Sequence, residues 1–180
     1  MTIGLIGFGE LGSAVAERFR RQEHAVTVYN RTLSRPLAQG HETVNTPAEL
    51  LQRSSSLILL ALADTATVNA VLGGQDGLLA ANLEDRLIVD LTSHSPEEAP
   101  GLHERIHRAG GRYLEAPVAG TPEQALTGEL ELWASGHLAD FEAARPVLEL
   151  IAWPCIHAGG PGAASRIKQH HDQTVAESPR

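Results

Sequence analysis

Three glycines near the start of the chain have a spacing that suits the binding of a phosphate chain. The hexapeptide "GFGELG" follows an apolar, β-branched run and opens a segment of helical periodicity. In a G-x-G-x-x-G loop, the first glycine permits a tight turn and the second lets the backbone approach a pyrophosphate. The third lets the helix pack closely on the strand. The sequence therefore predicts a dinucleotide site at the N-terminus of this helix, with a ligand-free glycine turn as the alternative. The expected contacts are Gly7, Phe8, Gly9, Glu10, Leu11 and Gly12.

An arginine follows the second apolar run, where NAD-binding chains usually carry a carboxylate for the ribose 2′-hydroxyl. The stretch "YNRT" places Asn30, Arg31 and Thr32 at this point, with Arg35 as a further contact. A guanidinium can hold a phosphate through two parallel hydrogen bonds, so these residues favour NADP(H) over NAD(H). The alternative is that Arg31 is a solvated surface residue.

Lys168 is the only lysine in a chain that has thirteen arginines, and it follows the glycine-rich turn "GGPGAAS". Hydride transfer to a carbonyl carbon leaves negative charge on the oxygen, and this charge needs a proton donor within hydrogen-bond reach. A lysine ammonium is one such donor. From composition alone, a solvated lysine on a terminal helix is the alternative.

The stretch "HERIH" matches the zinc-binding pattern H-E-x-x-H through His103 and His107. The position where the longer form of the motif has a third histidine is Tyr113, and the segment ends at Gly110 and Gly111. We interpret it as a charged surface helix and predict no metal site.

The elements that must position these residues alternate along the chain. Strand-like runs occupy residues 2–8, 25–30, 55–62, 86–91, 112–118, 129–135 and 154–158. Helix-like segments occupy residues 10–24, 46–54, 64–72, 95–111 and 140–152, with Thr46 as an N-cap. Such alternation predicts an α/β, Rossmann-like, doubly wound fold with a mostly parallel sheet. Residues 1–165 would form the nucleotide domain, and residues 166–180 an interdomain helix with a polar, frayed tail.

Composition excludes several classes of function. The chain of 180 residues has a net charge of −8, which argues against a nucleic-acid binder. No apolar run is long enough for a membrane span, and the start lacks the basic region of a signal peptide. Cys155 is the single cysteine, as expected in a reducing cytoplasm.

Five motifs resemble, in order and spacing, the β-hydroxyacid dehydrogenases, which include the 3-hydroxyisobutyrate dehydrogenases, the tartronate semialdehyde reductases and their relative 6-phosphogluconate dehydrogenase. The resemblance covers nearly the whole chain, and some details are similar to imine reductases instead, such as "LTSHSPEEA" and "PGAAS". The motifs are "GLIGFGELG", "VYNRT", "VDLTSHSPEEA", "LEAPVAGTPEQALTGELELWASG" and "GGPGAASRIK".

The resemblance implies roles for individual residues. Lys168 matches the family's catalytic lysine, and its presence favours the hydroxyacid branch over the imine reductases. Three residues later, His171 replaces a substrate-holding asparagine, and Ala119-Gly120-Thr121 stands where the family has Ser-Gly-Gly. The expected substrate contacts are Ser93, Gly120, Thr121 and His171, and the further cofactor contacts are Leu62, Ala63 and Thr92.

The activity implied is NADP(H)-dependent hydride transfer to or from a small β-hydroxyacid or semialdehyde, with a homo-oligomer or partner protein completing the site. Family members continue after the lysine into an all-helical second domain that this sequence lacks. A catalytically incomplete NADP(H)-binding module and an imine reductase-like enzyme are therefore the alternatives.

Overall fold

The computed structural model describes residues 2–32, 40–54 and 56–177. Arg35, predicted as a second phosphate contact, lies outside the described residues. The chain folds around one twisted sheet in the order β3-β2-β1-β4-β5-β6-β8-β7, with β9 pairing on β8. The strands are β1 (Thr2–Ile6), β2 (Ala25–Tyr29), β3 (Glu42–Val44), β4 (Leu57–Leu60), β5 (Leu87–Asp90), β6 (Arg112–Glu115), β7 (Val118–Ala119), β8 (Leu130–Gly136) and β9 (Ala152–Gly159).

Most neighbouring strands run parallel, which confirms the predicted α/β fold with a mostly parallel sheet. The strands from β3 to β6 pair in parallel, and so do β8 and β9. Strand β8 pairs antiparallel with β6 and β7. The order reverses between β1 and β4, and a crevice outside the carboxyl ends of such strands is where open α/β sheets bind ligands.

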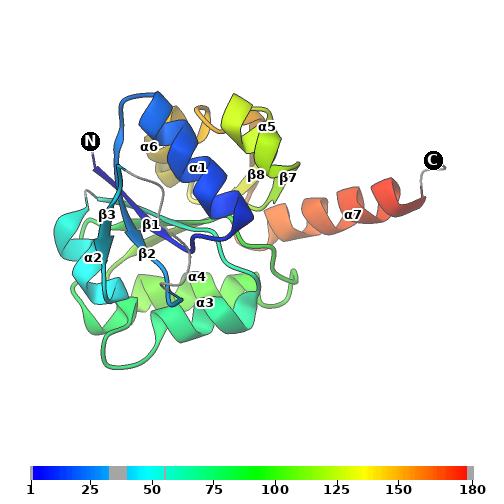
Figure 1. Ribbon diagram of the computed structural model, residues 1–180. Coiled ribbons are helices and arrows are strands. Elements are labelled where there is room, and N and C mark those ends of the chain that lie inside the picture. The colour runs from blue at the N-terminus through cyan, green and yellow to red at the C-terminus, as the bar shows by residue number, and fades with distance from the viewer. Residues whose placement is uncertain (1, 33–39, 55, 178–180) are drawn as a thin grey trace.

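Helices cover both faces of the sheet, as Figure 1 shows. One face carries α1 (Glu10–Arg21), α5 (Pro122–Thr127) and α6 (Leu138–Leu148). The other carries α2 (Pro47–Arg53), α3 (Thr65–Leu72) and α4 (Ala99–Arg108), beside a 3₁₀ turn at Leu78–Ala80. The last helix, α7 (Ala163–Glu177), begins against β8 and β9 and then projects away from the sheet (Figure 1).

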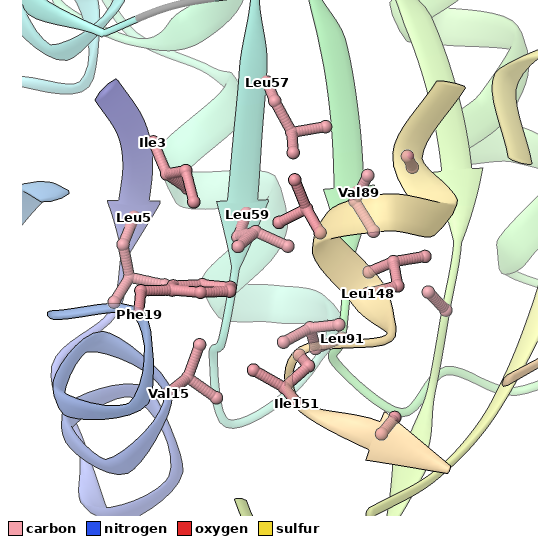
Figure 2. Packing of buried hydrophobic residues seen from close by; sticks show 14 of the residues in the cluster. Ile3, Leu5, Val15, Phe19, Leu57, Leu59, Val89, Leu91, Leu148 and Ile151 are labelled. Carbon is pink, nitrogen blue, oxygen red and sulfur yellow. The ribbon is translucent and has the colours of Figure 1, made fainter. Parts of the chain in front are cut away.

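The central strands are buried on both faces, so alternate side chains belong to different cores. Leu57 and Leu59 of β4 face the α1 side, whereas Ile58 and Leu60 face the α3 side. Figure 2 shows the first cluster, in which Phe19 of α1 packs among the strand side chains.

Local signals account for several helix boundaries. Thr46 caps α2 by accepting a hydrogen bond from the Glu49 N–H at 3.0 Å, as predicted. Asp64 caps α3 in the same way, and Pro100 lies in the first turn of α4, where its missing N–H costs nothing. Strands β3 and β7 were not predicted as separate strands, and they are only three and two residues long.

The end of the chain differs from the sequence prediction. α7 begins at Ala163, before the expected domain boundary at residue 165, and stays helical to Glu177. Side-chain contacts within the helix help to hold this part, because Lys168 pairs with Asp172 and the Thr174 hydroxyl donates to the His170 carbonyl. The described part of the expected frayed tail is therefore a regular helix.

Candidate functional site

The glycine loop between β1 and α1 has the geometry that its spacing predicts. Gly7 has a φ of +99°, and a Cβ at this residue would lie 2.2 Å from the Ala61 carbonyl oxygen. A Cβ on Gly12 would lie 2.1 Å from the Gly7 carbonyl oxygen, so helix and strand meet as closely as the motif requires. A Cβ on Gly9 would meet nothing within 4 Å. The backbone at Gly9 therefore faces open space, as a phosphate-binding turn must.

The N-terminus of α1 presents backbone N–H groups at this open space. Gly9 is its N-cap and provides no side chain to satisfy them. Unpaired N–H groups and the helix dipole both favour an anion here. The predicted contacts Glu10 and Leu11 form the first turn of this helix.

Asn30 joins the glycine loop to the end of β2. Its Oδ1 accepts a hydrogen bond from the Phe8 N–H at 3.4 Å, and its Nδ2 donates to the Thr32 carbonyl at 2.8 Å. Arg31 lies between these two anchored positions and is exposed. The amide of Asn30 thus fixes the backbone on which Arg31 is presented.

A cavity of about 340 Å³ opens beside Arg31, at the carboxyl ends of β1 and β2. The predicted residues Gly7, Asn30, Arg31, Thr32 and Leu62 line it, and among the described lining residues Asp76 is the only acidic one. The residues on the other side of the cavity were not predicted from the sequence, because their segments carry no phosphate-binding motif. That side consists of Asn45, Thr46 and Pro47 before and within α2, and Thr67, Ala70, Val71, Gly73, Asp76 and Gly77 in and after α3.

Two further loops meet beyond this cavity, after β4 and after β5. The Leu62 N–H donates to the Thr92 hydroxyl oxygen at 3.2 Å, which links the two loops directly. Thr92 is buried, whereas Ala63 and Ser93 are exposed at the surface of the same loops. The predicted cofactor contacts Leu62, Ala63 and Thr92 are therefore neighbours, with the predicted substrate contact Ser93 beside them.

A buried histidine that the sequence reading did not single out lies under these loops. The His94 side chain is fully buried; its Nε2 lies 2.9 Å from Asp90 Oδ2, and its Nδ1 lies 2.9 Å from Thr65 Oγ1. Burial lowers the pKa of His94, but the hydrogen bond and charge of Asp90 and the charges of Glu115 and Glu98 outweigh it and raise the pKa above its ordinary value.

A buried glutamate anchors the helix that carries Lys168. Glu115, the last residue of β6, accepts hydrogen bonds from the Gly162 N–H at 2.9 Å and the Ser165 N–H at 2.8 Å. The hydroxyls of Ser165 and Ser135 also donate to it. A carboxylate at a helix N-terminus satisfies its free N–H groups and interacts well with the dipole. Glu115 therefore fixes where α7 begins, one turn before Lys168.

Lys168 is paired with a carboxylate in this structure. Its Nζ lies 2.5 Å from Asp172 Oδ2, and only 13% of its side chain is exposed. Burial raises the pKa of Asp172, but hydrogen bonds from Lys168 and His171 lower it more, so the net shift is downward. The ammonium is thus largely shielded from solvent and is paired with a carboxylate in the next turn of its own helix.

The remaining predicted substrate residues also have structural partners. The ring of His171 lies 5.1 Å from that of Trp133 on β8, and its Nδ1 lies 3.2 Å from Asp172. The Thr121 hydroxyl caps α5 by accepting from the Gln124 N–H. Gly120 has a φ of +133° and no room for a Cβ, which would meet Gln124 and Leu130. The substrate roles of these residues stay predictions.

The H-E-x-x-H segment lies on α4, which packs against β6. His103 and His107 stack with ring centres 6.2 Å apart, and the ring of His137, at the start of α6, lies 5.5 Å from that of His103. Burial first, and then the charges of His137 and His107, lower the pKa of His103. Within residues 2–32, 40–54 and 56–177, no three His, Cys, Asp or Glu side chains are placed to hold a metal ion.

Residues 2–160 match the family described as the NAD binding domain of 6-phosphogluconate dehydrogenase. The chain belongs to this family. The match covers the glycine loop, the cavity and Glu115, and it ends just before α7.

Proteins similar to this chain include an enzyme and two proteins whose structures were solved with a bound nucleotide. The chain is 32% identical over 178 residues to 2-hydroxy-3-oxopropionate reductase of Escherichia coli, covering 98% of this chain and 61% of that protein. It superposes on imine reductase from Myxococcus stipitatus in complex with NADP⁺ with a TM-score of 0.89 at 30% identity, covering 98% of this chain and 61% of that one. It superposes on Psf3 in complex with NADP⁺ and 2-OPP with a TM-score of 0.87 at 31% identity, covering 96% and 62%.

The chain thus spans about three fifths of the length of these relatives. The family resemblance and the NAD-binding fold expected from the sequence are confirmed. No helix in the described part of the chain has the length and apolar character needed to cross a bilayer.

Proposed function

We propose that this domain binds NADP(H) and serves hydride transfer between the nicotinamide and a small β-hydroxyacid or semialdehyde. The observation that carries the proposal is the cavity that brings Gly7, the first glycine of the loop, together with Asn30, Arg31 and Thr32. A dinucleotide pyrophosphate fits the open backbone at Gly9, and its adenosine end fits the cavity. The NADP⁺ complexes of the related imine reductase and of Psf3 are in line with this cofactor.

Arg31 supports a 2′-phosphate over a 2′-hydroxyl. It lines the cavity at the end of β2, and no carboxylate takes the place where NAD-binding domains usually have one. The phosphate would bind the Arg31 guanidinium and the polar groups of Asn30 and Thr32. The hydrogen bond from the Phe8 N–H to the Asn30 side chain would keep this contact in register with the pyrophosphate.

Lys168 supports a reaction of the hydroxyacid dehydrogenase type over one of the imine reductase type. A bound nicotinamide supplies or accepts the hydride. Lys168 would donate a proton to the carbonyl oxygen during reduction and take it back in the reverse direction. The Lys168 ammonium has three N–H groups, so it can bond Asp172 with one and a substrate oxygen with another, while Glu115 holds the start of the helix in place. Ser93, Gly120, Thr121 and His171 would contact the substrate.

Two alternatives have specific support. An NADP(H)-binding module without turnover is favoured by the partners that occupy the substrate residues, namely Asp172 on Lys168 and the α5 cap on Thr121. An imine reductase-like activity is favoured by the similarity to the enzyme from Myxococcus stipitatus. A homo-oligomer is also part of the proposal, and Trp153 on β9, which is 71% exposed, is a large apolar side chain that a second copy of the chain would cover. The single cysteine supports a reducing compartment such as the cytoplasm.

One preparation tests these proposals. We expect a fluorescence titration to show tighter binding of NADPH than of NADH. The Arg31→Ala variant should lose about 10- to 100-fold in NADPH affinity and little in NADH affinity, since a hydrogen bond to a charged group is lost. Arg166→Ala, which removes an exposed arginine of α7, is the matched control for charge. Equal loss for both dinucleotides would contradict the 2′-phosphate contact, and no binding of either would refute the proposed function.

The second stage measures turnover with a panel of β-hydroxyacids, semialdehydes and cyclic imines. Turnover of a semialdehyde that is lost in Lys168→Ala supports the proposed reaction. Turnover of an imine supports the reductase alternative. NADPH binding with no turnover on any member of the panel supports the binding module.

A further inference from the structure

We infer that His94 is a buried imidazolium that clamps together the two loops beneath the nicotinamide end of the site, and so acts as a positioning residue for dinucleotide binding. The expected effect of His94 on dinucleotide binding rests on the proposed function. The charge of His94 and the link between the two loops are inferred from the hydrogen bonds around the ring.

The positions of the hydrogens around His94 follow from its partners. The Thr65 hydroxyl has one hydrogen, and it donates this to Glu98 Oε2 at 3.0 Å. Thr65 Oγ1 can then only accept from His94 Nδ1, at 2.9 Å. On the other side of the ring, Asp90 Oδ2 already accepts from the Tyr113 hydroxyl at 3.0 Å, so it is an acceptor for His94 Nε2 as well. Both ring nitrogens therefore carry hydrogens, which makes the ring an imidazolium.

The ring connects segments that are far apart in the sequence. Asp90 ends β5, His94 lies in the loop after it, and Thr65 is the first residue of α3 after β4. The same two loops carry Leu62, Ala63, Thr92 and Ser93, for which we propose contacts with the cofactor and substrate. Besides the His94 link, the hydrogen bond from the Leu62 N–H to Thr92 Oγ1 joins them. Together the two links fix the distance between the loops.

The groups that face His94 come from every element packed around it. Asp90 contacts it from β5 and Thr65 from α3, and the Tyr113 hydroxyl on β6 donates to the same Asp90 oxygen. The charges of Glu115 and Glu98 act on it from β6 and from the turn before α4. Among the described residues, the charged groups that act on His94 are these three carboxylates, and they raise its pKa despite burial. Since the folded-state pKa is raised, the clamp is complete below about pH 6.5 and is lost as the pH rises through the raised value.

His94 does not act on the substrate directly, because its side chain is fully buried. Its effect must reach the site through Thr92, whose N–H donates to Asp90 Oδ1 at 2.9 Å, and through Thr65. A merely structural role would change stability alone. The proposed role also changes how dinucleotide affinity depends on pH.

The decisive experiment titrates NADPH against the wild-type chain and His94→Gln from about pH 6 to about pH 9. We expect wild-type affinity to fall as His94 loses its proton. The variant should bind about tenfold more weakly at the low end and show no such fall, since its amide cannot donate on both sides. His170→Gln, an exposed histidine of α7, is the control and should keep the wild-type profile. A folded His94→Gln protein with wild-type affinity and slope would overturn the inference while leaving the proposed function intact.

A second measurement needs no ligand and covers the case in which His94→Gln does not fold. Histidine NMR titration should show one imidazolium that keeps both protons above the ordinary pH range of histidine. Thr65→Val should shift that titration downward, and Thr65→Ser should restore it, because only the hydroxyl accepts from Nδ1. A buried histidine that titrates as a neutral ring, or that ignores Thr65→Val, would refute the clamp even if NADPH binds. If the wild type binds no dinucleotide, the proposed function fails and the NMR result still decides the charge of His94.

Discussion

At the scale of single residues, two glycines of the same loop differ in what surrounds them. Gly12 is in contact with protein backbone, since a Cβ there would lie 2.1 Å from the Gly7 carbonyl oxygen. Gly9 faces open space, with nothing within 4 Å of the same added atom. Gly12 therefore serves the packing of α1 on β1, whereas Gly9 leaves room for a ligand that is large and close to the backbone.

This difference predicts opposite effects for two methyl groups. Gly12→Ala should destabilise the chain by about 1–3 kcal/mol, the usual cost of overpacking, because neither the helix nor the turn can give way easily. Gly9→Ala should leave the free energy of unfolding nearly unchanged but abolish NADPH binding, since its methyl group would occupy the ligand's space. Urea denaturation and fluorescence titration measure the two effects. Full binding by Gly9→Ala would place the pyrophosphate elsewhere.

At the scale of elements, Glu115 connects the central sheet to α7. Its carboxylate accepts from two backbone N–H groups at the start of the helix and from two serine hydroxyls. The helix is otherwise weakly held, because only Ala164 and Ser165 of its residues are buried. The position of Lys168 thus depends on one buried side chain that lies more than fifty residues earlier in the sequence.

Replacing Glu115 should loosen α7 more than the sheet. Glu115→Ala leaves several buried donors without an acceptor, and should cost about 3 kcal/mol or more in the free energy of unfolding. Glu115→Gln keeps the volume and should fall between this variant and the wild type. Hydrogen exchange should rise first in residues 163–177, with Glu97→Gln, an exposed carboxylate, as the control. Unchanged exchange in α7 would show that its other contacts suffice.

The histidines between α4 and α6 predict a loss of stability in acid. The pKa of His103 is lowered by burial and by His137 and His107, so the unfolded chain takes up a proton at a pH where the folded chain does not. The free energy of unfolding should therefore decrease as the pH falls below about 6.5, the ordinary histidine value.

His137→Gln removes one of the charges that oppose protonation of His103, and should make this decrease smaller. Comparison with the wild type cancels the contributions of the other histidines, and His170→Gln controls for the loss of an exposed imidazole. Denaturation curves at pH 5, 6 and 7 give the slopes. Equal slopes in His137→Gln and the wild type would mean that His103 does not sense its neighbour.

At the scale of the whole molecule, the sequence predicted what local patterns encode. The buried strands, the glycine loop and the Thr46 cap all depend on residues within a few positions of one another, and the structure has them as expected. The contacts that were missed join distant segments. Glu115 reaches α7, His94 reaches α3, and His137 approaches the histidines of α4 only because β8 runs antiparallel to β6. Contacts between such distant segments depend on the topology of the sheet, which cannot be predicted from any short stretch of sequence.

The site draws on loops from both halves of the sheet, so bound cofactor should stabilise the domain as one unit. The cavity and the glycine loop span β1, β2, α2 and α3, and the His94 and Thr92 contacts extend the same surface to β5. NADPH at about 100 times its Kd should add about 2.7 kcal/mol to the free energy of unfolding. For a chain of this size, the Tm should rise by roughly 5–10 °C in a single transition. At the same concentration NADH should raise the Tm less, and Arg31→Ala should remove that difference. Two separate transitions in calorimetry would instead mean that the halves of the sheet unfold independently and that the ligand holds only one of them.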